Sequence, residues 1–143
     1  MRYALPQPFE DLGHVADVGV AVEGSTAEEA LARLVLAYAA LLTGGECVEV
    51  RGDERLAVRG EGRTGVAVAL LRELLFRFAT ARVVPGECEV VRLDDLGCEV
   101  VVGLGRYDPE RHAEGLDLKA VTWHAARMEE SGGLWRGQIV FDI

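Results

Sequence analysis

The chain has 143 residues, of which 50% are hydrophobic and 27% are charged, so it can form a core and is not predominantly disordered. This length predicts one domain spanning residues 1–143. Acidic residues outnumber basic residues by 24 to 15, which gives a formal net charge of −9. Such a charge argues against direct, non-specific binding to nucleic acid or to an anionic membrane, because both depend on lysine and arginine.

The N-terminal segment has no apolar stretch typical of a secretory signal peptide. The apolar run within residues 34–42 is shorter than the ~20 residues that cross a bilayer. The three cysteines, Cys47, Cys88 and Cys98, are far apart and form no CxxC pair, which argues against a disulfide framework and a zinc site. We therefore expect a cytoplasmic protein with reduced, mostly buried cysteines.

The segment before residue 45 predicts strands followed by a helix. Residues 9–23 contain two short strands interrupted around residues 13–17, and valines alternate with small or polar residues in the second strand. Ser25 and Glu28 have the spacing of a capping box. Apolar residues then recur at helical spacing to about Leu42, which predicts a helix with one apolar face, stopped by Gly44.

The rest of the chain predicts more strands and one further helix. Residues 46–59 have the pattern of a hairpin with its turn at residues 51–54, and a helix is expected over residues 64–79. Pro85-Gly86 indicates a turn. Further strands are expected over residues 87–93, 98–104, 119–128 and 134–141. Two helices packed on a mostly antiparallel sheet of about seven strands predict an α+β fold.

Oxygen donors are concentrated at the last two residues. Asp142 offers a side-chain carboxylate and Ile143 a main-chain carboxylate beside it, and two carboxylates this close need a cation or hydrogen-bond donors to stay charged. A solvated polar end is the simpler interpretation. The alternative is a Ca²⁺ or Mg²⁺ site, because both ions prefer oxygen ligands.

His14 and Asp17 lie three residues apart just before a predicted strand. Taken alone, Asp17 fits a turn and His14 a structural or surface position. Without a third ligand, the pair is a weak indication of a metal site.

Residues 119–124 alternate between two faces of a predicted strand. Lys119 and Trp123 share one face, where Trp123 is expected in the core, and Thr122 and His124 share the other. Lys119 is the only lysine beside 14 arginines. Chance is the simpler interpretation of a single residue, and the alternative is a position that needs a compact ammonium group.

Six short motifs, in this order, resemble those of the archease family. They are HVADVG at 14–19, GSTAEEA at 24–30, LLF at 74–76, YDPERH at 107–112, KAVTWH at 119–124 and DI at 142–143. The resemblance runs from about Phe9 to Ile143 and implies a strand–helix–strand–strand module with inserted elements. It also implies a non-enzymatic accessory factor for the GTP-dependent RNA ligase RtcB, promoting its guanylylation and turnover in tRNA splicing or RNA repair. A tRNA methyltransferase is the alternative partner.

The resemblance further implies a divalent-cation site formed by Asp17, Asp142 and Ile143. The implied ion is Ca²⁺, with Mg²⁺ or Mn²⁺ as alternatives, and the oxygen donors of these residues suit such hard cations. Four residues would support the ligands or contact the partner. They are His14, Lys119, Thr122 and His124.

Three positions depart from the family pattern, so partner contacts are expected to differ there. Ser25 stands in place of an acidic or lysyl residue, residues 62–65 in place of an acidic stretch, and Trp123 in place of tyrosine.

A metal-dependent hydrolase using the same carboxylates is a competing hypothesis, with His14 or His124 as the base. It would need a deep pocket, and the sequence has no GxGxxG, GxxxxGK[ST], HExxH or GxSxG signature. A protein acting directly on RNA would instead need a clustered arginine patch.

Overall fold

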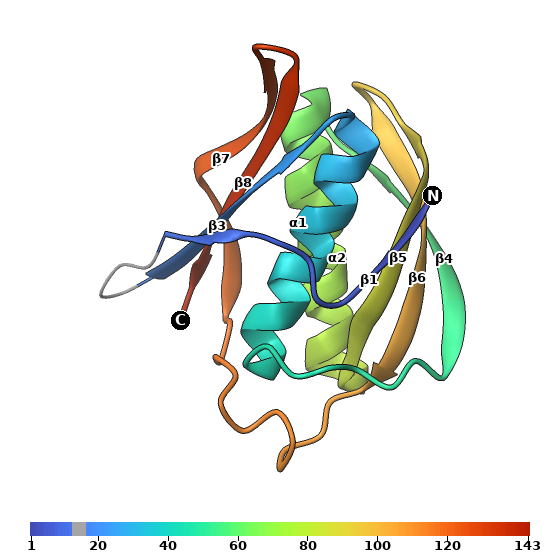
Figure 1. The fold of residues 1–143 in the computed structure, drawn as a ribbon, viewed down its shortest axis with the longest axis vertical. Coiled ribbons are helices and arrows are strands. Elements are labelled where there is room, and N and C mark those ends of the chain that lie inside the picture. Colours follow the sequence, from blue (N-terminus) through green and yellow to red (C-terminus); the bar gives the residue numbers. More distant parts are fainter. Residues whose placement is uncertain (13–16) are drawn as a thin grey trace.

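The computed structural model describes residues 1–12 and 17–143, and two helices lie between two antiparallel four-stranded sheets in this part of the chain (Figure 1). The elements are β1 (Arg2–Ala4), β2 (Glu10–Asp11), β3 (Asp17–Gly24), α1 (Ala27–Thr43), β4 (Gly52–Arg59), α2 (Gly62–Ala81), β5 (Val83–Leu93), β6 (Gly97–Arg106), β7 (Ala120–Ser131) and β8 (Leu134–Asp142). The β6 sheet has the strand order β1-β5-β6-β4, and the β3 sheet has the order β2-β3-β8-β7. The α+β prediction is confirmed, with two sheets in place of one.

Helix α1 lies at the centre of the molecule and packs against both sheets (Figure 1). Thirteen of its 17 residues are buried, so the expectation of a single apolar face was wrong. A helix that is apolar on all sides is stable only when it is surrounded, and the two sheets surround α1. Tyr38 of α1 stacks on Phe141 of β8 with ring centroids 5.8 Å apart, which joins the helix to the β3 sheet.

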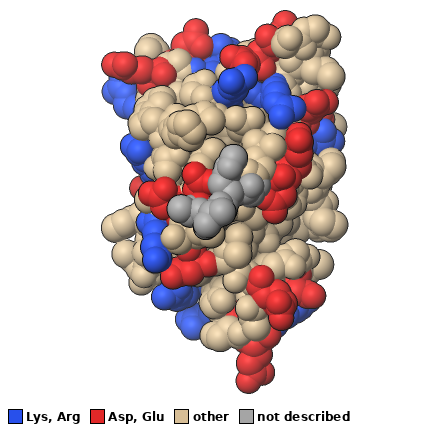
Figure 2. All heavy atoms as spheres, turned by 90° about the vertical axis from the view of Figure 1, so that its left-hand side faces the viewer, with Lys and Arg blue, Asp and Glu red and all other residues tan. Residues whose placement is uncertain are grey.

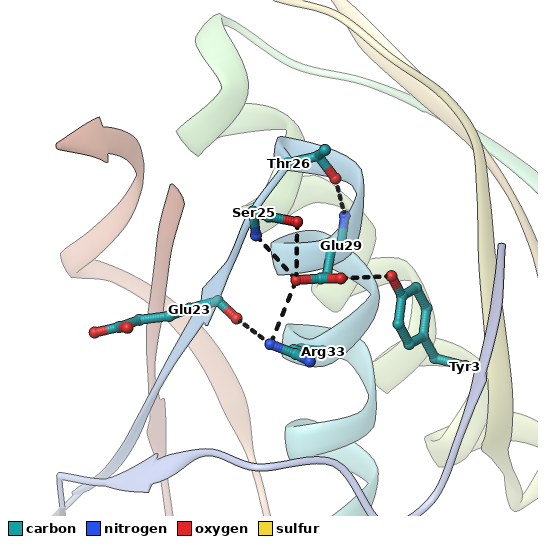
Figure 3. A network of polar contacts seen from close by, with 6 residues as sticks. All are labelled: Tyr3, Glu23, Ser25, Thr26, Glu29 and Arg33. Atoms are coloured by element: carbon teal, nitrogen blue, oxygen red, sulfur yellow. Dashed lines mark hydrogen bonds and ion pairs between the residues drawn. The ribbon is translucent and has the colours of Figure 1, made fainter. Parts of the chain in front are cut away.

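The cap of α1 lies one residue later than the sequence predicted (Figure 3). Thr26 is the N-cap, and its hydroxyl accepts a hydrogen bond of 3.0 Å from the Glu29 amide. The Glu29 carboxylate in turn accepts hydrogen bonds from the Ser25 amide at 2.9 Å and from the Tyr3 hydroxyl at 2.8 Å. Thr26 and Glu29 therefore form the capping pair, and Tyr3 ties β1 to this helix end.

The hairpin expected over residues 46–59 does not form. Only Gly52–Arg59 is a strand, β4, and it pairs with β6 across residues 97–104. Pro85 and Gly86, expected in a turn, lie inside β5 at a register shift, because a bulge accommodates a proline within a strand.

Strand β7 contains a large irregularity in the middle of the KAVTWH motif. Thr122 pairs with Val140 and Arg127 pairs with Gln138, so residues 123–126 lie opposite Ile139 alone. Regular alternation of side chains ends at Thr122, which explains why Trp123 is 55% exposed although the sequence predicted a core position.

Neither α1 nor α2, the helices of the described part, is long and apolar enough to cross a membrane.

Candidate functional site

Asp17 and Asp142 lie directly opposite each other on neighbouring strands. Asp17 begins β3 and Asp142 ends β8, and the antiparallel register pairs their Cα atoms. Side chains of directly opposed residues point to the same face of a sheet, with Cβ atoms about 4.5–5.5 Å apart. The fold therefore brings these two predicted ligand residues together from opposite ends of the chain.

The core fixes the face on which the two carboxylates lie. The next pair along the strands, Val18 and Phe141, is buried against the helices. Because side chains alternate along a strand, Asp17 and Asp142 point to the other face of the β3 sheet.

Two oxygen atoms on this outer face are buried and lack a hydrogen-bond partner among the described residues. They are Oδ1 of Asp17 and Oγ1 of Thr122. Thr122 pairs with Val140, and Val140 pairs with Gly19, so Thr122 lies on the same face, two residue pairs along the strands from Asp142. Burial of a polar oxygen costs about 1–3 kcal/mol when its hydrogen bond is missing. Four atoms elsewhere in the described part share this property, on Arg33, Tyr38, Thr43 and Arg63.

Strand β7 completes the surroundings of Asp142. Ala120 is its register partner, and the Lys119 amide donates a hydrogen bond of 2.8 Å to the Asp142 carbonyl oxygen. The backbone of Lys119 is thus held at the end of β8, and its side chain is exposed. Ile143 follows Asp142 and is 40% exposed.

The structure places His124 on β7 but outside its regular pairing with β8. His124 is exposed and lies in the irregular part of β7, beyond the point where alternation from Thr122 ends. His14 lies outside the described residues.

Negative charge is concentrated on this face of the molecule. Figure 2 shows acidic side chains on several sides of the grey segment, with lysine and arginine side chains above it and along the left side of this face. Like charges directly opposite in a sheet destabilise it by up to about 1 kcal/mol. In the described part, no group of three or more His, Cys, Asp or Glu side chains could hold a metal ion, and the pair supplies only two such side chains.

The two carboxylates differ in their exposure. Asp142 is exposed, whereas Asp17 is half-buried. Among five hollows on the described surface, none is lined by Asp17 or Asp142.

Sequence reasoning did not assign a role to His112, which is 2% exposed. Its Nδ1 accepts a hydrogen bond of 2.9 Å from the Asp108 amide, and its Nε2 lies 3.1 Å from the Cys47 carbonyl oxygen. The spacing of Asp108 and His112 within YDPERH could have predicted the contact between them. In the structure His112 connects the loop after β6 to the segment before β4.

Comparison with known proteins decides the family. The family described as "Archease protein family (MTH1598/TM1083)" matches residues 9–143. The chain belongs to the archease family. An archease of Pyrococcus furiosus is 29% identical over 139 residues, which cover 94% of this chain and 98% of that protein.

Solved archease-like structures have the same fold. The solution structure of Methanobacterium thermoautotrophicum protein 1598 superposes with a TM-score of 0.75 at 26% identity, covering 94% of this chain and 98% of that one. The crystal structure of an archease from Thermotoga maritima, described as a possible chaperone, gives a TM-score of 0.60 at 16% identity over 99% of both chains. The archease resemblance drawn from the six motifs is thereby confirmed.

Proposed function

We propose that this archease is an accessory factor for an RtcB-type RNA ligase, promoting ligase guanylylation and multiple turnover in tRNA splicing or RNA repair. Family membership supports this role, and the pairing of Asp17 with Asp142 on the outer face of the β3 sheet is the structural observation that carries it. The protein acts by docking to the ligase and not as an enzyme itself. The free thiols of Cys47, Cys88 and Cys98 fit a reducing compartment such as the cytoplasm.

The carboxylate pair holds a divalent cation in this proposal, with Ca²⁺ as the first choice and Mg²⁺ or Mn²⁺ as alternatives. The residues fit such an ion, because the buried Oδ1 of Asp17 lacks a partner among the described residues and Asp142 supplies a second carboxylate opposite it. A main-chain oxygen of Ile143 completes the protein ligands. When bound, the cation would supply positive charge and open coordination positions at the docking surface.

The residues around the ion position it and contact the ligase. The register of β3 and β8 holds Asp17 and Asp142 on rigid strands, and the Lys119 amide fixes the backbone at Asp142. In this proposal Thr122 supports the ion site, and Lys119, His14 and His124 contact the partner. A ligase that binds RNA needs positive charge along its channel, which the acidic face of the archease complements.

Multiple-turnover ligation by the cognate ligase tests this function. Substoichiometric archease should raise the number of ligated products per ligase, and Asp142→Asn should abolish most of the stimulation. Glu130→Gln is the matched control, because Glu130 is exposed at the far end of the same sheet and its loss changes the net charge equally. Equal stimulation by Asp142→Asn and the wild type, or no stimulation by the wild type, would refute the proposal.

A further inference from the structure

Three arginines line one cavity at the edge of the β6 sheet, away from the face that carries Asp17 and Asp142. Arg51 lies directly before β4, Arg106 is the last residue of β6, and Arg111 belongs to the following loop. We call this hollow the arginine cavity; its volume is about 260 Å³.

The arginines of this cavity differ from most others in the protein. Nine arginines of the described part form ion pairs within 4.0 Å, among them Arg2, Arg55 and Arg77. Arg106 and Arg111 form none within that distance in the described ranges 1–12 and 17–143. Arg51 is among the nine, but its partner Glu49 is 4.0 Å away and both side chains are largely exposed. Such an ion pair contributes little to the stability of the protein.

One of the two carboxylates in the cavity is engaged by its own loop. The Oδ1 atom of Asp108 accepts hydrogen bonds from the amides of Glu110 at 3.0 Å and Arg111 at 3.3 Å, and these bonds lower the pKa of Asp108. With Glu49 as the second carboxylate, three guanidinium groups still leave the lining net positive. A positive hollow in a protein of net charge −9 attracts an anion locally.

Hydrogen bonds through His112 join the two backbone segments that carry these exposed arginines. Because the Asp108 amide donates to Nδ1 of His112, the ring donates from Nε2 to the Cys47 carbonyl oxygen. This buried ring connects the loop after β6 to the segment before β4. That segment also lies directly on β6, where a Cβ added to Gly105 would stand 2.2 Å from the Glu49 carbonyl oxygen.

We propose that the arginine cavity binds the phosphate group of a small molecule. Guanidinium groups match phosphate oxygens in geometry and charge, and a preorganised frame lowers the entropic cost of bringing three of them together. The cavity is smaller than the ~300–1,000 Å³ typical of whole drug-sized ligands, so it accommodates a phosphate or diphosphate group and leaves any attached moiety outside.

Amide NMR of the full chain tests the proposal with inorganic phosphate, pyrophosphate and ADP at constant ionic strength. Saturable shifts should appear at residues 105–112, and Arg106→Gln should weaken binding by about tenfold to hundredfold, as for the loss of one charge-assisted hydrogen bond. Arg111→Gln should act similarly. Arg59→Gln is the matched control, because Arg59 is exposed at the opposite end of β4 and forms no ion pair within 4.0 Å among the described residues.

The three probes distinguish the sources of the phosphate group. Tighter binding of pyrophosphate and ADP than of phosphate assigns the cavity to a diphosphate, whereas equal affinities assign it to a single phosphate. Shifts that do not saturate at millimolar phosphate, or equal affinities for Arg106→Gln, Arg111→Gln and Arg59→Gln, would overturn the proposal. Because the variants leave Asp17 and Asp142 intact, such a failure does not affect the proposed ligase role.

Discussion

Asp17 and Asp142 are partners across β3 and β8, and the adjacent pair, Val18 and Phe141, fixes their orientation. Val18 and Phe141 are buried in the core, where Phe141 stacks on Tyr38. A slip of one residue in the strand register would move these apolar side chains to the surface and the carboxylates into the core. The geometry of the candidate ion site is therefore set by core packing.

Replacing one of the facing carboxylates should stabilise the protein when no divalent cation is present. Asp142→Asn removes the repulsion between like charges, and we expect a gain of roughly 0.2–1 kcal/mol in the free energy of unfolding. Urea unfolding in the presence of a chelator measures it. Glu130→Gln should bring no comparable gain, and a destabilised Asp142→Asn would show that the two carboxylates do not repel each other.

Two aromatic residues of the β3 sheet should differ sharply in their contribution to stability. Phe141→Ala should cost about 3–5 kcal/mol, because the ring is fully buried. Trp123→Ala should change the free energy of unfolding by only about 0.5 kcal/mol, because Trp123 is 55% exposed. Chemical denaturation of both variants checks this, and a large loss in Trp123→Ala would contradict the exposed position.

Local patterns in the sequence predicted most of the elements that hold the site. The valine alternation after residue 17 predicted β3, and apolar periodicity predicted α1 with its end at Gly44. The capping residue was assigned one position early, because Ser25 and Thr26 are both good N-caps and only the fold decides which one begins the helix.

Long-range features of the site could not be predicted from local patterns. The pairing of Asp17 with Asp142 depends on which strands become neighbours in the sheet. The sequence predicted that these residues come together only through the resemblance to the archease family. The sequence around Thr122 gives no sign of the bulge that follows it. Regular alternation therefore predicted a core position for Trp123, which is exposed, and a shared face for His124 and Thr122, although alternation does not hold inside the bulge. The register of an irregular strand cannot be predicted from alternation, because the extra residues of a bulge have no cross-strand partner.

The cap at Glu29 should make stability depend on pH below about 5. Hydrogen bonds from the Ser25 amide and the Tyr3 hydroxyl lower the pKa of Glu29 from its ordinary value of 4.5. Its contribution is therefore complete above the pKa of the unfolded chain and is lost as the pH falls through the lower, folded value.

Glu29→Gln should consequently be less stable than the wild type at pH 7, and the difference should shrink as the pH falls. Thermal unfolding between neutral and acidic pH measures the difference. Glu28→Gln is the control, because Glu28 is exposed in the same helical turn. A difference between Glu29→Gln and the wild type that persists unchanged in acid would contradict this account.

The three cysteines should react with thiol reagents in two distinct classes. Cys47 is exposed, whereas burial raises the pKa of Cys88 to about 12 and that of Cys98 to about 11. Because the thiolate is the reactive form, Ellman's reagent should modify Cys47 alone in the native protein and all three residues in denaturant. Rapid modification of Cys88 in the native state would show that the β6 sheet is not packed as described.

Calorimetric titration with Ca²⁺ tests most directly whether the ends of β3 and β8 form one cation site. We expect saturable binding of one ion by the wild type and by Glu130→Gln. Asp17→Asn and Asp142→Asn should each weaken binding by at least about tenfold, since each removes a carboxylate ligand. Unchanged affinity in both aspartate variants would contradict the account, because the ion would then bind elsewhere.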